Sequence, residues 1–286
     1  MFGFININKP KGITSHDVIY RLRKATKIKQ IGHAGTLDPL AQGVLPVAVG
    51  KATRLIEYLS DEKGYCVTFE FGKISDTYDT EGTIEKFSDI LVTRENLENI
   101  LCEFVGNITQ IPPAYSAVHY NGKRLYELAR EGLIPEDIPK RIVTVEKVEI
   151  LSFDEISQKC VMDINCSKGT YIRSIVHDIG QRLGSGAVMT DLVRTKSSNF
   201  KINSAVELEK LQTSLDVGSV LINPLEVLSF NKIQLSDDEF SKVKNGNPFP
   251  AQDDLGEAEL MLEYNNKLVA IATATENIIK IDKVFV

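Results

Sequence analysis

The sequence predicts an α+β protein, because strand-like and helix-like segments both recur along a chain of 286 residues. Apolar and polar residues alternate over 65–71 and 161–166, which is typical of strands with one buried face. Apolar residues recur at helical spacing over 94–104 and 172–183. With 43% hydrophobic residues, the chain can bury one sizeable core and a smaller one.

A domain boundary is expected near residues 223–224, where Asn-Pro follows a polar stretch. The large unit then covers residues 1–225, and a small, mostly β unit covers 226–286. No apolar run approaches the length of a membrane span, and the first residues lack the pattern of an export signal. We therefore expect a cytoplasmic protein without membrane association.

The charge of the chain is unevenly distributed. The net charge is -6, yet the first 60 residues hold nine Lys or Arg and three acidic residues, so this part carries +6 and the rest -12. A basic region favours a polyanionic partner such as RNA, although basic helix faces are also common as solvated surface. Ser15, in the same region, is expected to cap a helix that presents several of these cations.

Residues 32–46 read Gly-His-Ala-Gly-Thr-Leu-Asp-Pro-Leu-Ala-Gln-Gly-Val-Leu-Pro. Three glycines and two prolines fix the backbone around His33 and Asp38 and leave space for something to approach closely. Considered alone, Asp38 would be a turn residue, because Asp-Pro pairs start turns.

Residues 110–130 interleave tyrosines with Lys and Arg, a composition typical of surfaces that contact RNA. Asn121-Gly122 within this stretch predicts a tight hairpin turn. A helical stripe with solvated charges is the alternative for the same residues.

Residues 166–173, Cys-Ser-Lys-Gly-Thr-Tyr-Ile-Arg, lead into the helix expected over 172–183. Arg173 stands in the first turn of that helix, where a cation opposes the helix dipole. We therefore expect an anionic partner beside it, either a phosphate or a carboxylate. Asp76 and Asp79 are expected to cap turns or to orient a neighbouring catalytic or RNA-binding residue.

These motifs together resemble those of bacterial tRNA pseudouridine-55 synthases, the TruB family. The resembling segments are 8–16, 32–46, 50–54, 71–82, 110–130, 166–173 and 191–195. The resemblance implies a mixed, largely antiparallel pseudouridine-synthase sheet flanked by helices, with a small C-terminal PUA-like module that binds RNA. It also implies that uridine 55 in the T arm of tRNA is isomerised to pseudouridine by a monomer, with no cofactor and no metal.

The resemblance assigns roles to individual residues. Asp38 is implied to be the essential catalytic residue and Arg173 its ionic partner, while Tyr65 is implied to stack on the target base. His33, Tyr171 and Leu192 are implied to line the active site and hold the RNA. Basic residues in the same motifs are expected to contact the substrate RNA as well: Lys9, Lys123 and Arg124.

Two other function classes agree with parts of the sequence. An RNA-binding tRNA chaperone without chemistry would explain the basic end and the tyrosines, but it leaves Asp38 and Arg173 without a role. A metal-assisted hydrolase could use His33 and Asp38, yet no further ligands lie at metal-site spacing. The four cysteines are too far apart for paired zinc knuckles, and are expected to be reduced core residues.

Overall fold

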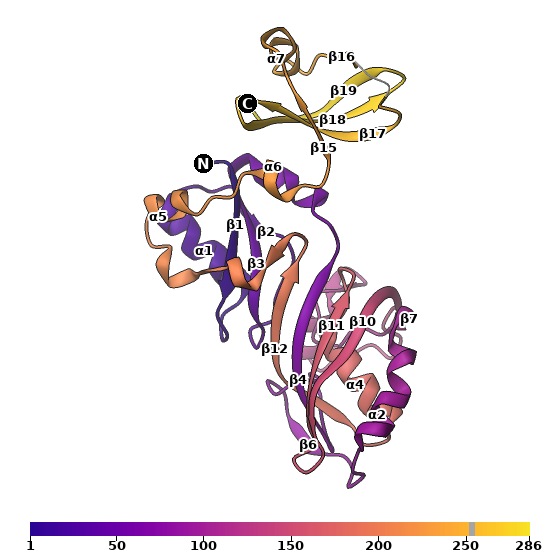
Figure 1. The fold of residues 1–286 in the computed structure, drawn as a ribbon. Coiled ribbons are helices and arrows are strands. Elements are labelled where there is room, and N and C mark those ends of the chain that lie inside the picture. The colour runs from indigo at the N-terminus through magenta and orange to yellow at the C-terminus, as the bar shows by residue number, and fades with distance from the viewer. Residues whose placement is uncertain (252–254) are drawn as a thin grey trace.

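The computed structural model describes residues 1–251 and 255–286, which form a ten-stranded sheet, a five-stranded sheet and two short hairpins (Figure 1). The predicted α+β class is confirmed. Nowhere in these two ranges is there a helix long and apolar enough to cross a membrane.

The large sheet has the order β14-β1-β3-β12-β4-β11-β10-β7, with β2 added at β3 and β13 at β12. Its pairs are antiparallel except for β1 with β14 and β3 with β12, so it is mixed and largely antiparallel, as expected. The strands are β1 (Gly3–Lys9), β2 (Ile31–His33), β3 (Gln42–Val49), β4 (Lys63–Phe71), β7 (Gly106–Gln110), β10 (Arg141–Asp154), β11 (Lys159–Cys166), β12 (Ala187–Ser197), β13 (Phe200–Lys201) and β14 (Val206–Glu207).

Helices and hairpins connect these strands. The α-helices are α1 (Ser15–Thr26), α2 (Arg94–Leu101), α3 (Leu125–Arg130), α4 (Ile172–Arg182), α5 (Ser214–Ser219), α6 (Pro224–Val227) and α7 (Asp237–Val243). The 3-10 helices are η1 (Gly50–Tyr58), η2 (Cys102–Phe104), η3 (Ile202–Ser204) and η4 (Leu208–Lys210). The hairpins pair β5 (Lys73–Ser75) with β6 (Ile84–Lys86) and β8 (His119–Tyr120) with β9 (Lys123–Arg124).

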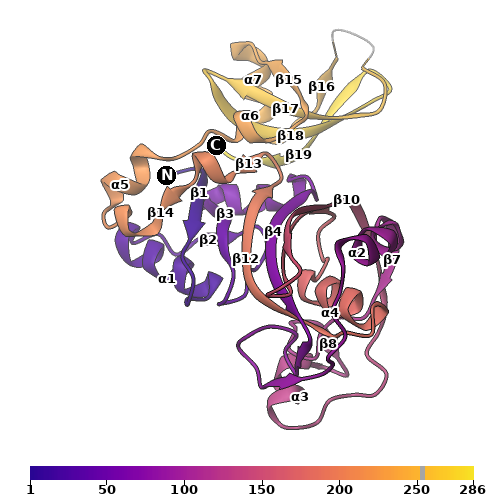
Figure 2. The same cartoon turned by 60° about the horizontal axis from the view of Figure 1, so that its bottom comes forward.

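The half of the sheet around β4 and β11 packs against α2 and α4 (Figure 2). Phe69 and Met162 on these strands and Ile175 on α4 are fully buried in one cluster. The alternation in the sequence predicted this arrangement, because it leaves one apolar face on each strand and one apolar stripe on each helix. The segment that carries α3 and β8 protrudes from the large sheet in Figure 2.

Strands β1 and β3, by contrast, are covered on both faces. Ile5 and Leu45 pack with α1 and α5, whereas Phe4 and Ala48 on the opposite face pack in a second cluster. A strand that is covered on both faces needs apolar residues at nearly every position, and residues 44–49 are apolar throughout.

The second sheet covers that opposite face. Its order is β15-β17-β18-β19-β16, and its strands are β15 (Asn231–Gln234), β16 (Phe249–Pro250), β17 (Ala258–Tyr264), β18 (Lys267–Thr275) and β19 (Ile278–Val284). We call residues 228–286 the tail. The tail is mostly β, as expected; its likeness to a PUA module and the division after residue 225 remain predictions.

The tail shares a core with the large sheet. Met261 and Phe285 of the tail lie in one buried cluster with Phe4 and Leu55. The ring of Phe285 stacks on Phe2, with centroids 5.5 Å apart and planes inclined by 29°. Removing the tail would therefore expose apolar surface on β1, β3 and η1.

We expect Phe285→Ala to lower the free energy of unfolding by about 3–5 kcal/mol, because it deletes a ring from a core that both units share. Urea denaturation followed by far-UV circular dichroism measures this loss. Phe87→Ala is the control, since Phe87 is 44% exposed. Equal losses in the two variants would contradict the shared core.

Candidate active site

Asp38 lies in the loop that joins β2 to β3. Neighbouring segments form hydrogen bonds with the loop backbone on both sides of Asp38. Leu37 donates its N–H to Ser15 Oγ at 2.8 Å, and Ser15 Oγ donates to Leu37 O at 3.2 Å. Gly12 N–H donates to Pro39 O at 2.8 Å. The prediction for Ser15 was wrong: Thr14 caps α1 through a capping box with Asp17, because its side chain is the one positioned over the first turn.

Arg194 of β12 anchors the rest of the loop. This guanidinium is fully buried and donates three hydrogen bonds to backbone carbonyls, to Val44 O at 2.7 Å, to Gly35 O at 3.1 Å and to Thr36 O at 3.3 Å. Gly43 permits the backbone of Arg194 to approach closely: its φ is +104°, and a Cβ atom there would lie 2.3 Å from Arg194 O. The sequence prediction missed Arg194.

The guanidinium of Arg173, at the N-terminus of α4, makes four contacts. Its Nη2 lies 2.9 Å from Asp38 Oδ2 and donates to Tyr115 O at 3.0 Å. Its Nη1 donates to Thr77 O at 3.0 Å and lies 3.5 Å from Asp79 Oδ2. The expected anionic partner is therefore present, and it is the carboxylate of Asp38.

The two carboxylates around Arg173 differ in exposure. The Asp79 side chain is 2% exposed, and its Oδ1 accepts hydrogen bonds from Thr77 Oγ1 at 2.6 Å and from Glu81 N at 3.0 Å. Asp79 thus orients Arg173, in agreement with the orienting role expected for it. The Asp38 side chain is 37% exposed, so it is the carboxylate that a substrate can reach.

Tyr65 and Leu192 lie in the hydrophobic cluster that also contains Leu37 of the loop. Tyr65 on β4 is opposite Arg194 in the antiparallel register with β12. Burial raises the pKa of the Tyr65 hydroxyl, the Arg194 guanidinium opposes that shift through its charge and a hydrogen bond, and the charge of Asp38 adds to it. The structure therefore brings Tyr65, Leu192 and Asp38 to one place.

Tyr171 precedes the first residue of α4 and is held by its backbone. Its N–H donates to Gln110 Oε1 at 2.8 Å, and Gln110 Nε2 donates to Tyr171 O at 2.9 Å. The guanidinium carbon of Arg141 lies 5.3 Å from the centroid of the Tyr171 ring. The tyrosine is thus fixed two residues before Arg173, and its side chain is only half-buried.

His33, at the end of β2, is half-buried, and its Nδ1 is buried without a hydrogen-bond partner. Burial lowers the pKa of His33, and the positive charges of Arg194 and His16 lower it further. His33 is therefore a neutral ring with an unsatisfied nitrogen beside the loop.

Lys9 differs from its expected role as a surface contact for RNA. The side chain is fully buried at the end of β1 and donates to Ile13 O at 2.6 Å and Pro10 O at 3.0 Å. A phosphate cannot reach it in this structure. Lys9 instead supports the turn before α1, and the sequence pattern could not show this because the acceptors are backbone carbonyls.

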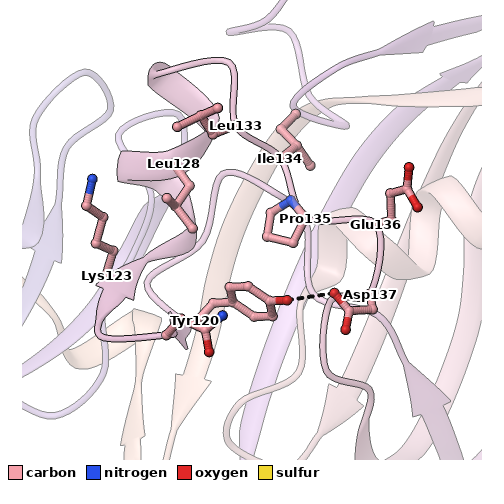
Figure 3. A pocket seen from close by; sticks show the side chains of 9 residues that line it. Tyr120, Lys123, Leu128, Leu133, Ile134, Pro135, Glu136 and Asp137 are labelled. Atoms are coloured by element: carbon pink, nitrogen blue, oxygen red, sulfur yellow. Dashed lines mark hydrogen bonds between the residues drawn. The ribbon is translucent and has the colours of Figure 1, made fainter.

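Lys123 and Arg124 are exposed on the hairpin of β8 and β9, and the predicted tight turn at Asn121-Gly122 is confirmed. Beside this hairpin is a cavity of about 480 Å³, shown in Figure 3. Leu128, Leu133, Ile134 and Pro135 line it, and Tyr120 Oη donates to Asp137 across it at 2.7 Å.

The root of this protruding segment is attached to α4. Ser174 Oγ donates to Ile111 O at 2.8 Å, in addition to the contacts of Gln110 with Tyr171 and of Tyr115 with Arg173. Within the described part of the chain, no three His, Cys, Asp or Glu side chains are grouped so that they could hold a metal ion.

We expect Arg194→Lys to destabilise the protein by several kcal/mol, because an ammonium cannot replace a planar fork that serves three carbonyls and each such charged hydrogen bond contributes about 1.5–3 kcal/mol. Urea unfolding measures the effect. Arg182→Lys is the control, since Arg182 is exposed and pairs with Glu103 on the surface. A loss of stability no larger than that of the control would contradict the anchoring role of Arg194.

The burial of Lys9 predicts that the stability of the fold depends on pH. Burial lowers its pKa from the ordinary 10.5 to about 8 in the folded state. Between these values the unfolded chain binds a proton that the folded chain lacks, so the free energy of unfolding should rise with pH from about 8 to 10.5. Lys9→Met should reduce this rise in urea titrations at stepped pH, whereas Lys24→Met, at an exposed position, should keep it. Equal slopes in the two variants would contradict the prediction.

The chain matches two family models. Residues 23–172 match the one described as TruB family pseudouridylate synthase (N terminal domain), and residues 173–227 match tRNA pseudouridylate synthase B C-terminal domain. The second of these ranges contains α4 from Arg173 onward, β12 to β14, α5 and α6, and it ends before the five-stranded sheet.

Curated relatives carry the same family name. The tRNA pseudouridine synthase B of Lactobacillus johnsonii is 41% identical over 279 residues, which is 94% of this chain and 93% of the relative. That of Clostridium novyi is 49% identical over 214 residues, 74% of this chain and 73% of the relative.

Solved structures show the same fold. A chain of a Cbf5-Nop10-Gar1 complex superimposes with a TM-score of 0.73 at 27% identity, over 100% of this chain and 85% of that one. A chain from an H/ACA RNP bound to a substrate RNA superimposes with a TM-score of 0.70 at 25% identity, over 100% and 85%. The chain belongs to the TruB family of pseudouridylate synthases.

Proposed function

We propose that this protein converts uridine 55 in the T arm of tRNA to pseudouridine, with Asp38 as the essential catalytic residue. The observation that carries the proposal is the contact at 2.9 Å between Asp38 and the buried Arg173, in a loop that Arg194 and Ser15 fix from either side. The relatives named tRNA pseudouridine synthase B support tRNA as the substrate.

The reaction breaks the bond between N1 of uracil and C1′ of the ribose and forms a bond between C5 and C1′. The proton leaves C5 and N1 gains one, so the product is an isomer with no net oxidation and no leaving group. A carboxylate can carry this chemistry alone, and no cofactor or metal is needed. Arg173 contacts Oδ2 of Asp38, which leaves Oδ1 for the reacting nucleotide.

Tyr65 is proposed to stack on the target base. Its ring belongs to the apolar cluster beside Asp38, and aromatic rings are the usual surface on which unstacked RNA bases are held. Leu192 and Tyr171 complete the wall around the base. Because the target base must leave a folded loop, the enzyme has to compensate an unstacking cost of a few kcal/mol.

The remaining proposed contacts hold the opened RNA. His33 is half-buried beside the loop, so the accessible part of its ring can contact the opened RNA. Lys123 and Arg124 are exposed on a protruding hairpin and can bind phosphates, whereas the buried Lys9 is left out of this set. A cytoplasmic monomer that binds the T arm is part of the same proposal.

We expect Asp38→Asn to abolish pseudouridine formation while the affinity for tRNA changes little, because the amide keeps the shape and loses the reactive oxygen charge, and affinity comes from many phosphate and stacking contacts. Mapping pseudouridine in an unmodified tRNA after single-turnover reaction gives the rate and the position. A tRNA with cytidine in place of uridine 55 should stay unmodified.

Asp89→Asn is the matched control, because Asp89 is exposed and pairs with Lys86 on the surface. It should react at the rate of the unmutated enzyme. An Asp38→Asn enzyme that formed pseudouridine at that rate would contradict the catalytic assignment, and modification of a position other than 55 would contradict the proposed target.

A further inference from the structure

A strained residue stands between the two groups that Arg173 Nη1 binds. Thr77 supplies the carbonyl and Asp79 the carboxylate, and Tyr78 lies between them with φ +65°. Positive φ is rare for a bulky side chain, and such strain persists only where the surroundings enforce it. The left-handed turn at Tyr78 lets both flanking residues present an oxygen to the same nitrogen.

The side chain of Tyr78 packs against the ring of His177. The two rings are stacked, with centroids 3.9 Å apart and planes inclined by 12°. His177 is four residues after Arg173 on α4, and residues at this spacing lie on one face of a helix. One helix therefore supplies both the guanidinium and the ring that holds the segment bound to it.

Other contacts fix the backbone of the strained residue but not its ring. Tyr78 N–H donates to Ser75 O and Met189 N–H donates to Tyr78 O, both at 3.1 Å. Within the described part of the chain, the buried Nδ1 of His177 has no hydrogen-bond partner, whereas its ring stacks on that of Tyr78. Burial lowers the pKa of His177, which keeps the ring neutral against the tyrosine.

We infer that Tyr78 and His177 are a positioning pair: their stack holds Thr77 O and Asp79 against Arg173, and through Arg173 it orients Asp38. Neither ring is proposed to touch the substrate. The inference rests on the proposed catalytic role of Asp38, since it specifies what keeps that carboxylate in place. It assigns a positioning role to the ring of Tyr78, whereas a residue that merely links Thr77 to Asp79 would need no ring.

Four variants test the stack. We expect His177→Ala and Tyr78→Gly to lower the single-turnover rate of pseudouridine formation at saturating enzyme at least tenfold, with the dissociation constant for tRNA unchanged within twofold. His177→Phe and Tyr78→Phe should restore most of the rate, because both keep a planar ring in the stack. Tyr78→Gly is informative because glycine relieves the strain at positive φ, so a merely structural role predicts no loss of rate.

A matched control is available in the tail. Phe240 and Tyr264 stack in nearly the same geometry, with centroids 4.1 Å apart and planes inclined by 6°. Phe240→Ala removes a comparable stack far from Arg173 along the chain and in the other sheet unit, and its single-turnover rate should equal that of the unmutated enzyme.

A double-mutant cycle distinguishes action through Asp79 from an independent effect. In an Asp79→Asn background, His177→Ala should slow the reaction less than twofold further, because the group that it positions is already altered. Fully multiplicative losses would overturn the inference, and so would an unaltered rate in both His177→Ala and Tyr78→Gly. If Asp38→Asn is inactive while these variants keep the full rate, only this inference fails; if Asp38→Asn is active, the proposed function fails.

Discussion

The arrangement of this molecule depends on the need to satisfy one buried guanidinium. The side chain of Arg173 is 6% exposed, and a cation so placed requires partners for its donors. It finds them in three segments that are far apart in the sequence, at Asp38, at Thr77 and Asp79, and at Tyr115. The loop, the strained segment and the root of the protruding insert therefore meet at the N-terminus of α4.

Arg194 complements this contact from the other side of the loop. It binds backbone carbonyls, so it fixes the course of the chain, whereas Arg173 binds the carboxylate and fixes the side chain. Both tasks need a planar fork with several donors, which explains why arginine stands at both positions. The loop thus starts from a defined geometry before any RNA arrives, which is what electrostatic and proximity catalysis require.

Local patterns in the sequence predicted much of the fold. The alternation over 65–71 and 161–166 became β4 and β11, and the stripe over 172–183 became α4. The helix expected over 94–104 ends earlier, at Leu101, because residues 102–104 tighten into the 3-10 helix η2. Periodicity could not show that the tail completes the core around Phe4, since that contact joins residues more than 200 positions apart.

The site was predictable to a different extent. The dipole argument required an anion near Arg173, but only the resemblance to a family named Asp38 as that anion. Arg194 was missed and Lys9 was placed at the surface for one physical reason: cations are expected there, and their burial depends on carbonyls that a sequence does not reveal. A usable signal existed for Arg194, because it lies two positions after Leu192 on the same strand, so both side chains point to the same buried face.

Hydrogen exchange of backbone amides tests most directly whether Arg173 stabilises the three segments that contain Asp38, Asp79 and Tyr115. In Arg173→Lys, which keeps the charge and loses the fork, we expect faster exchange over residues 34–41, 75–80 and 112–118 together. Arg182→Lys, an exposed position on the same helix, should change exchange only around its partner Glu103. Unaltered protection of the three segments in Arg173→Lys would contradict the account.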